Sequence, residues 1–288
     1  DNSDWVAGYE PYSGGSGTSG DPYQIATTND LIDLSNFSGD WDDYFIQTAD
    51  ISFNADETTV DWNGDGSNGP NEGFSQIGND NTNFTGSYGG QGNSIDNLYI
   101  DRSSTYDVGL FGYVNNTTDT SRIENLTLNN PDYNAKGRLG SLIGKIEGLG
   151  IISNCHTSNM QITATNDFIG GLIGLADSNI DTLTVKNCST TGSVESTGGG
   201  NVGGLLGTGE PSTSKLYITI QGCYSKADVS ANGNYAGGLI GWIRYSEIKN
   251  SYATGSATGN SYYASFSGNL NSCTVSKCYS TGDSHFAG

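Results

Sequence analysis

A cluster of the type Gly-Leu-Ile-Gly recurs at nearly even intervals along the second part of the chain. Its copies read VGLFG at 108–112, LGSLIG at 139–144, IGGLIG at 169–174, VGGLLG at 202–207, AGGLIG at 236–241 and a degraded ASFSG at 264–268. Successive final glycines lie 32, 30, 33, 34 and 27 residues apart. An internal repeat of this length is typical of solenoids, in which each unit buries its apolar face only by stacking on its neighbours.

A second motif of six residues follows each cluster. Its copies are IENLTL (123–128), ISNCHT (152–157), VKNCST (185–190), IQGCYS (220–225), IKNSYA (248–253) and VSKCYS (275–280). Position one is aliphatic and position two polar, as in a strand with one buried face. Position three is mostly Asn or Gly, which tolerate the left-handed backbone conformation, and position four is again of a buried type. The motif therefore predicts a strand that bends at position three, after which positions four and six face inward and position five faces outward.

These patterns predict an all-β fold, a right-handed parallel β-helix. The chain contains 43 glycines, which disfavour helices, and the repeats lack a helical period. We expect residues 108–288 to form one continuous solenoid of repeats, and residues 1–107 to form an acidic N-terminal cap and the first rungs. Within the cap, Thr28, Asn29 and Asp30 precede LIDLSNF and are expected to provide the N-cap of a short helix. Each motif position then becomes a ladder with a step of about 4.8 Å.

Four of the five cysteines occupy position four of the motif, and Cys273 lies outside it. One interpretation is disulfide bonds or metal ligands, as in many extracellular proteins. The other is that stacked cysteines fill a narrow core as small apolar groups. We favour core filling, because parallel Cβ vectors on successive rungs do not suit disulfide torsions and no Cys-x-x-Cys pair is present.

The charge of the chain is strongly negative. Its 31 acidic and 11 basic residues give a net charge of −20, and residues 1–110 hold 19 of the acids but only one base. This charge disfavours nucleic acid and anionic membrane surfaces as partners. No apolar run approaches the roughly 18 residues needed to cross a bilayer. The first residues do not resemble a signal peptide, and the last ones resemble the start of a further repeat, so we expect a fragment with neighbouring domains in a longer chain.

Several motifs in their order resemble the GLUG-motif proteins of bacterial cell surfaces. They are GSGTSGDPYQIATTNDLIDLS, FIQTADISF, GFSQIGN, FTGSYGGQGNSIDNLYI and VGLFGYV, followed by GGLIG and IKNSYATGSATG. Such domains occur in large secreted adhesin-like proteins and as accessory parts of immunoglobulin A peptidases. The resemblance implies a β-helix that is secreted or displayed on the cell surface. It does not imply peptidase activity, because the chain has only His156 and His285 and no His-Glu-x-x-His motif.

The sequence DWNGDGSNGPNE at 61–72 matches a calcium-binding loop. Oxygen ligands at alternate positions would converge on calcium around the sharp turn at Gly66, with the last residue bidentate. The expected ligands are Asp61, Asn63, Asp65, Ser67 and Glu72. Helix patterns are missing on both sides, so a solvated acidic turn is the alternative. If calcium binds, its role is expected to be structural.

Position five of the motif, which is predicted to face outward, holds Tyr224, Tyr252 and Tyr279 in three consecutive copies. In the earlier copies the same position holds Thr127, His156 and Ser189. A row of exposed rings could stack on sugar faces or on a protein, because tyrosine combines apolar area with a polar tip. The alternative is that like residues merely stabilise the solenoid by packing across rungs.

No catalytic residue is predicted. The acids of the repeats, Glu147, Asp177 and Glu210 among them, are scattered in the sequence and are not expected to recur in a column shared with Arg or Lys. We therefore expect a non-catalytic extracellular module for adhesion or surface binding in a larger bacterial protein, with a surface glycan or a protein as ligand. The alternative is a carbohydrate-binding or polysaccharide-degrading β-helix. A third possibility is ice binding through the threonines of ITAT (162–165), TLTV (182–185) and YITI (217–220).

Overall fold

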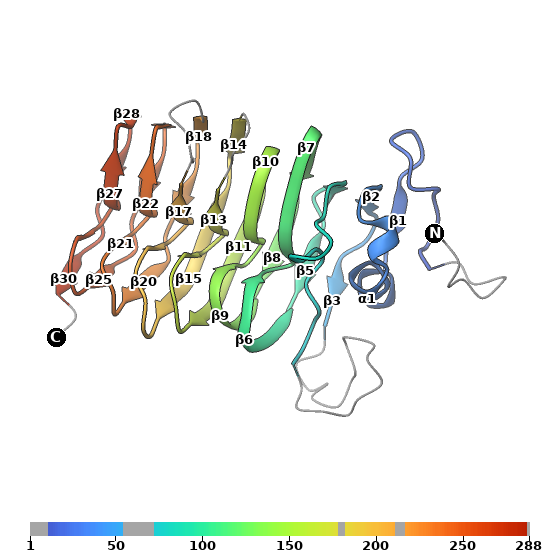
Figure 1. Ribbon diagram of the computed structural model, residues 1–288, viewed down its shortest axis with the longest axis horizontal. Helices are drawn as coiled ribbons and strands as arrows, with labels where there is room; N and C mark the ends of the chain where they lie inside the picture. The colour runs from blue at the N-terminus through green and yellow to red at the C-terminus, as the bar shows by residue number, and fades with distance from the viewer. Residues whose placement is uncertain (1–10, 54–71, 178–181, 211–216, 287–288) are drawn as a thin grey trace.

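The protein is a parallel β-solenoid. The computed structural model describes residues 11–53, 72–177, 182–210 and 217–286. Its named strands pair in parallel, each mainly with the equivalent strands of the neighbouring coils. Figure 1 shows the coils stacked in one row, from the helix α1 near the N-terminus to strand β30 near the C-terminus. The parallel β-helix fold expected from the repeats is therefore confirmed.

The strands belong to two hydrogen-bonded sets. The first set comprises β1 (Tyr23–Ile25), β2 (Tyr44–Gln47), β4 (Ser87–Gly89), β7 (Phe111–Glu124), β10 (Ile143–Ser153), β13 (Ile173–Ala176), β14 (Thr182–Lys186), β17 (Leu206–Gly209), β18 (Tyr217–Gln221), β22 (Ile240–Arg244), β23 (Ser246–Lys249), β27 (Ser267–Asn271) and β28 (Thr274–Ser276). The second comprises β3 (Ile51–Ser52), β5 (Ser94–Asp96), β6 (Tyr99–Val108), β8 (Thr127–Asn129), β9 (Asp132–Gly140), β11 (His156–Ala164), β12 (Ile169–Gly170), β15 (Ser189–Ser196), β16 (Val202–Gly203), β19 (Tyr224–Ser225), β20 (Asp228–Ala231), β21 (Ala236–Gly237), β24 (Tyr252–Ala253), β25 (Ala257–Gly259), β26 (Tyr263–Ala264), β29 (Tyr279–Ser280) and β30 (Ser284–Phe286).

The aliphatic first position of the six-residue motif forms one column, which is buried from Ile123 to Ile248 and 43% exposed at Val275 in the last coil. Its members are directly paired from each coil to the next, in the order Ile123, Ile152, Val185, Ile220, Ile248 and Val275. Tyr88, which pairs with Ile123, continues the column toward the N-terminus. Ile123 and Ile248 are both fully buried. Burial of a side chain of this size stabilises a fold by about 1.5 to 3 kcal/mol, so the column is a main source of stability.

The bend predicted at position three is present in every copy. All six residues have a positive φ, namely Asn125 (57°), Asn154 (52°), Asn187 (54°), Gly222 (66°), Asn250 (51°) and Lys277 (53°). The asparagine side chains also bond to one another along the stack. The amide of Asn154 donates to Asn125 at 2.9 Å, and that of Asn187 donates to Asn154 at 3.3 Å. The ladder thus holds successive coils in the same register.

The glycine clusters make a sharp corner between the two sets of strands. In the fourth cluster the chain passes from β16 to β17 within four residues. A Cβ atom on Gly203 would lie 2.0 Å from the carbonyl oxygen of Leu206. The equivalent distances at Gly170 and Gly237 are both 1.9 Å. Glycine is therefore required at the corner in these three coils, whereas Ala264 takes the equivalent position in the degraded last cluster.

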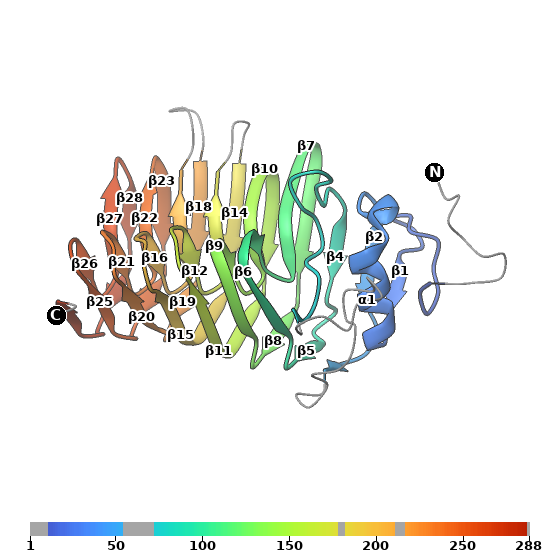
Figure 2. The same cartoon turned by 60° about the horizontal axis from the view of Figure 1, so that its bottom comes forward.

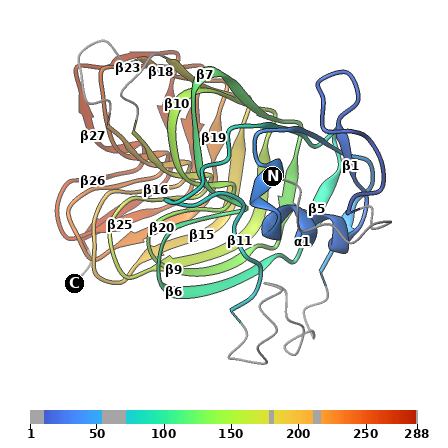
Figure 3. The same ribbon diagram turned by 45° about the vertical axis from the view of Figure 1, so that its right-hand side comes forward.

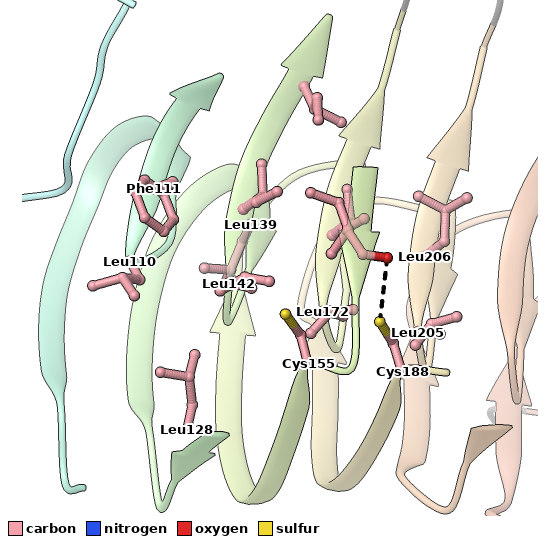
Figure 4. Close-up of a cluster of buried hydrophobic side chains, with 14 of the residues drawn as sticks. Leu110, Phe111, Leu128, Leu139, Leu142, Cys155, Leu172, Cys188, Leu205 and Leu206 are labelled. Atoms are coloured by element: carbon pink, nitrogen blue, oxygen red, sulfur yellow. Dashed lines mark hydrogen bonds between the residues drawn. The ribbon is translucent and has the colours of Figure 1, made fainter. Parts of the chain in front are cut away.

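Buried cysteines line the core as expected. Cys155, Cys188 and Cys223 are at most 1% exposed, and all five cysteines carry free thiols. Figure 4 shows the sulfur atoms of Cys155 and Cys188 on successive coils, beside leucines of the glycine clusters. Burial raises the pKa of the Cys188 thiol well above its ordinary value. These cysteines therefore act as small apolar groups of the core.

The helix α1 (Thr28–Asn36) and the short 3₁₀ helix η1 (Ser38–Asp40) form the cap together with β1 and β2. Figures 2 and 3 show α1 lying across the N-terminal end of the stack. The expectation that residues 28–30 provide the N-cap needs correction. The N-cap is Thr27, whose side chain accepts from the Asp30 amide, while the Asp30 carboxylate accepts from the Thr27 amide. Asp30 at the third helical position thus closes a capping box.

The cap and the repeats are continuous in the structure. Strands β4 and β5 pair with β7 and β8, and β6 pairs with β9. The boundary drawn at residues 107 and 108 falls inside β6, which runs from Tyr99 to Val108. The first rungs therefore begin before the glycine clusters, and residues 84–100 belong to them.

Candidate binding surface

Tyr224, Tyr252 and Tyr279 lie in one column on consecutive coils. Each is the first residue of a short strand, β19, β24 or β29, and the three are paired in register. The ring centroids of Tyr224 and Tyr252 are 4.9 Å apart with an angle of 4° between the planes. Tyr252 and Tyr279 follow at 5.0 Å and 6°. Because the backbone bends at position three, the side chains at position five turn outward. The three tyrosine rings therefore form a flat ladder on the surface, called the tyrosine ladder below.

The tyrosine ladder is open to solvent on its outer side. Tyr279 is 56% exposed, while Tyr224 and Tyr252 are partly exposed because neighbouring rings cover their faces. The ammonium group of Lys226 lies 5.5 Å from the centroid of the Tyr224 ring. Desolvation, together with the adjacent Tyr224 and Tyr279, raises the pKa of Tyr252. Its hydroxyl is therefore protonated at neutral pH and can donate a hydrogen bond.

The same column continues toward the N-terminus with polar residues. Thr127, His156 and Ser189 are paired in register with one another, and Ser189 with Tyr224. The Nδ1 atom of His156 is 2.8 Å from the hydroxyl of Ser189. Burial lowers the pKa of His156, so the ring is neutral at pH 7. The column thus changes from a polar to an aromatic surface at β19.

Most of the predicted calcium loop lies outside the described residues. Of the five expected ligands only Glu72 is described, and its carboxylate forms an ion pair with Arg102 at 2.9 Å. Within residues 11–53, 72–177, 182–210 and 217–286, no group of three or more His, Cys, Asp or Glu side chains is arranged to hold a metal ion. Calcium binding by residues 61–72 therefore stays a prediction from the sequence.

The expectation that the acids of the repeats share no column is wrong. Ile146 pairs with Ala176, Ala176 with Gly209, and Gly209 with Ile243. The residues that follow these four are Glu147, Asp177, Glu210 and Arg244, which therefore lie side by side on consecutive coils. Each stands three residues after the final glycine of its cluster, and that spacing was the signal that sequence reasoning missed.

Ion pairs balance part of this acidic column. Glu147 pairs with Lys145 at 2.7 Å, and Glu210 lies 3.5 Å from Arg244. Burial and the neighbouring Glu147 raise the pKa of Asp177, against the effect of Lys145. The column therefore places three carboxyl groups with different environments along one line.

The threonines that suggested ice binding do not form an extended array in the described strands. Thr184 pairs with Thr219, but the neighbour of Thr184 on the other side is Ile151. Thr163 pairs with Asn134 and Glu195. A regular threonine lattice is thus missing from these strands.

The glycine cluster at 236–241 and the bend at Asn250 belong to one coil of the solenoid. The profile of the GLUG motif matches residues 232–258, which contain both. The chain carries the GLUG motif. The other clusters pair in register with this one, so the same structural unit repeats along the solenoid.

Two known proteins are similar to larger parts of the chain. Halomucin of Haloquadratum walsbyi is 38% identical over 174 residues, which is 57% of this chain and 2% of halomucin. The chain therefore spans a very small part of that protein. The crystal structure of a candidate immunoglobulin A1 protease from Bacteroides ovatus has a TM-score of 0.67 and 20% identity, covering 94% of this chain and 78% of the other. At this identity the likeness shows a shared fold.

Among the described residues, no helix combines the length and the hydropathy needed to cross a membrane.

Proposed function

We propose that the chain is a non-catalytic, surface-associated β-helix module that binds a surface glycan or a protein through the tyrosine ladder. The similarity to a segment of halomucin and the GLUG motif support a place in a secreted or surface-displayed protein. The observation that carries the proposal is the ladder itself, in which three rings lie parallel on consecutive coils and one is 56% exposed.

The ladder suits binding for physical reasons. Tyrosine has few rotatable bonds, and stacking on both neighbours fixes the ring of Tyr252, so little conformational entropy is lost when a ligand covers it. The aligned ring edges and hydroxyl groups offer apolar area together with hydrogen bonds. A rigid solenoid holds these groups at a constant spacing, which favours a long ligand that follows the stack.

Polysaccharide cleavage is the second candidate function. It is favoured by the column of Glu147, Asp177 and Glu210, because glycoside hydrolysis uses a pair of neighbouring carboxyl groups. A reducing-end assay on the same polysaccharides used for binding distinguishes the two functions. Product formation that is lost in Asp177→Asn and in Glu210→Gln would overturn the non-catalytic proposal.

Binding to immobilised mucin and to a glycan array tests the tyrosine ladder. We expect Tyr252→Ala and Tyr279→Ala to weaken binding at least tenfold while the thermal unfolding midpoint changes little. Tyr44→Ala is a matched control, because Tyr44 is 37% exposed on β2, in the other set of strands. Equal binding by the wild type and both ladder variants would contradict the proposal.

A further inference from the structure

A trench runs along the solenoid beside the glycine corners, separate from the tyrosine ladder. Its larger part is a hollow of about 450 Å³. One wall is formed by residues at the corner, among them Phe168 and Tyr235. The other wall is formed by Glu210, which directly follows β17, and by Trp242 on β22. Figure 3 looks obliquely along the stack and shows the chain turning inward at this corner, between β16 and the strands that follow it.

A second hollow of about 310 Å³ adjoins the first. The two share Asp167 and Phe168 as lining residues, and the second adds Tyr106, Arg138 and Asp177. The walls of both are continuous columns. The corner wall contains Arg138, Phe168, Asn201 and Tyr235, which precede the paired residues Leu139, Ile169, Val202 and Ala236. The strand wall contains Lys145, Leu175 and Trp242 of one paired column. Thr208 of the same column is fully buried, and on its coil Glu210 lines the trench. The two hollows therefore form one trench parallel to the long axis.

Aromatic rings recur along the trench. Phe168, Tyr235 and Trp242 line the larger hollow, and Tyr106 lines the smaller one. Tyr262, which is 65% exposed, stacks on Tyr235 with centroids 5.2 Å apart and extends the row by one coil. An aromatic ring has a flat apolar face with a negative electrostatic potential, which matches the C–H groups on the apolar face of a sugar ring and disfavours an anion.

Hydrogen-bonding groups lie between these rings. Asp167 accepts a hydrogen bond from the Gly200 amide at 2.6 Å, and the Asn166 amide donates to the Tyr106 hydroxyl at 2.7 Å, so both side chains are held in place. Glu210 is 46% exposed in its side chain and has free capacity for further hydrogen bonds. Fixed carboxylate and amide groups of this kind bind sugar hydroxyls without large reorganisation.

The charges disfavour an acidic ligand. Of the two cations among the lining residues, Lys145 pairs with Glu147 at 2.7 Å, and Arg138 lies 2.9 Å from Asp107 and 3.9 Å from Asp80. Arg244, which lies 5.5 Å from the centroid of the Trp242 ring, is 3.5 Å from Glu210. Asp167, Asp177 and Glu210 add negative charge, and the whole chain carries −20. A uronate, sulfate or phosphate group would meet repulsion here.

We propose that this trench binds a single neutral polysaccharide chain, which lies along the solenoid axis with its sugar rings against Phe168, Tyr235 and Trp242. Four coils at about 4.8 Å per step give a continuous wall of about 14 Å between the first and the last, and Tyr262 adds a further step. A linear chain fits this shape, whereas a compact small molecule would fill only one hollow.

Isothermal titration calorimetry with soluble β-glucan, mannan, xylan and galactan tests the trench, with polygalacturonate and alginate as acidic probes. We expect at least one neutral polysaccharide to bind, and Trp242→Ala to weaken its affinity at least tenfold. Trp242→Phe keeps a ring and should retain affinity within a few fold. Glu210→Gln alters only a partly exposed carboxylate and should weaken binding several fold without affecting the fold.

Tyr44→Ala is the control, because Tyr44 is 37% exposed on β2 and belongs neither to the trench nor to the ladder. Its affinity for the neutral polysaccharide should equal that of the wild type. Absence of binding by all four neutral polysaccharides, tighter binding of polygalacturonate or alginate, or wild-type affinity in a folded Trp242→Ala variant would each overturn the proposal. Trp242 lies outside the ladder and Tyr279 lies outside the trench, so Trp242→Ala and Tyr279→Ala test the two proposals separately.

Discussion

Replacing Gly203 by alanine should destabilise the solenoid strongly. The added Cβ would lie 2.0 Å from the Leu206 carbonyl oxygen, 2.6 Å from the Gly241 amide nitrogen and 2.9 Å from the Leu206 carbonyl carbon. These atoms are backbone on two adjacent coils, so no side-chain rotation can relieve the contact. Overpacking in a well-packed interior costs about 1 to 3 kcal/mol, and the backbone contacts place this case at or above the upper end.

Thermal unfolding followed by circular dichroism measures the effect. In chains of about 150 to 250 residues, which are slightly shorter than this one, a loss of about 3 kcal/mol corresponds to a fall of about 6 to 12 °C in the unfolding midpoint. Gly39→Ala is the matched control, because a Cβ there has no atom within 4 Å. It should leave the midpoint unchanged or raise it slightly. An unfolding midpoint of Gly203→Ala within 2 °C of the wild type corresponds to a loss of at most about 1 kcal/mol and would refute the steric reasoning.

Three further predictions concern protons, thiols and calcium. Burial raises the pKa of Asp107 to about 7 against the effect of Arg138, so the folded state holds a proton that the unfolded state has lost, and stability should fall as pH rises from about 4 to 7. The unfolding midpoint at pH 5 and pH 8, compared between the wild type and Asp107→Asn, should show a weaker fall in the variant, and identical slopes would contradict this. In a thiol-reagent titration of the native chain, the partly exposed Cys273 and Cys278 should react before the buried Cys155, Cys188 and Cys223, whereas rapid reaction of all five would contradict the buried ladder. Excess calcium should raise the unfolding midpoint by several degrees relative to chelator, and Asp65→Ala should remove the rise; no calcium effect in the wild type would exclude a stabilising role.

The repeats made most of the solenoid predictable. Each strand pairs with its own copy one repeat later, so the spacing between copies directly gives the register. The column of Ile123, Ile152 and Val185, the bend at Asn154 and the stacked tyrosines all follow from that rule. The acidic column was equally visible in principle, since Glu147, Asp177 and Glu210 keep a constant distance from the final glycine of the cluster.

The N-terminal region was less predictable because it is not a copy of the repeat. Nothing in its sequence specifies that Tyr88 pairs with Ile123, or that Tyr12, Tyr23 and Phe45 pack together with ring centroids 4.6 to 5.7 Å apart. The helix α1 was expected from local residues, but its capping depends on side-chain geometry, which moved the N-cap to Thr27. Without internal repetition, pairing depends on which distant segments bury apolar surface together.

The sequence by itself therefore determined the architecture, the period and the residues of each column. The tertiary structure alone decided the trench, in which Phe168 and Tyr235 at the corner face Trp242 across a hollow. The columns read from the sequence predict which residues stack along the axis, but they do not predict how two faces of one coil are oriented relative to each other. Glycines allow the two faces to approach closely at the corner, since a Cβ atom on Gly207 would lie 2.6 Å from the Ile169 amide nitrogen, and buried leucines pack in the core behind it. Residues on different faces come together only after the whole coil has closed.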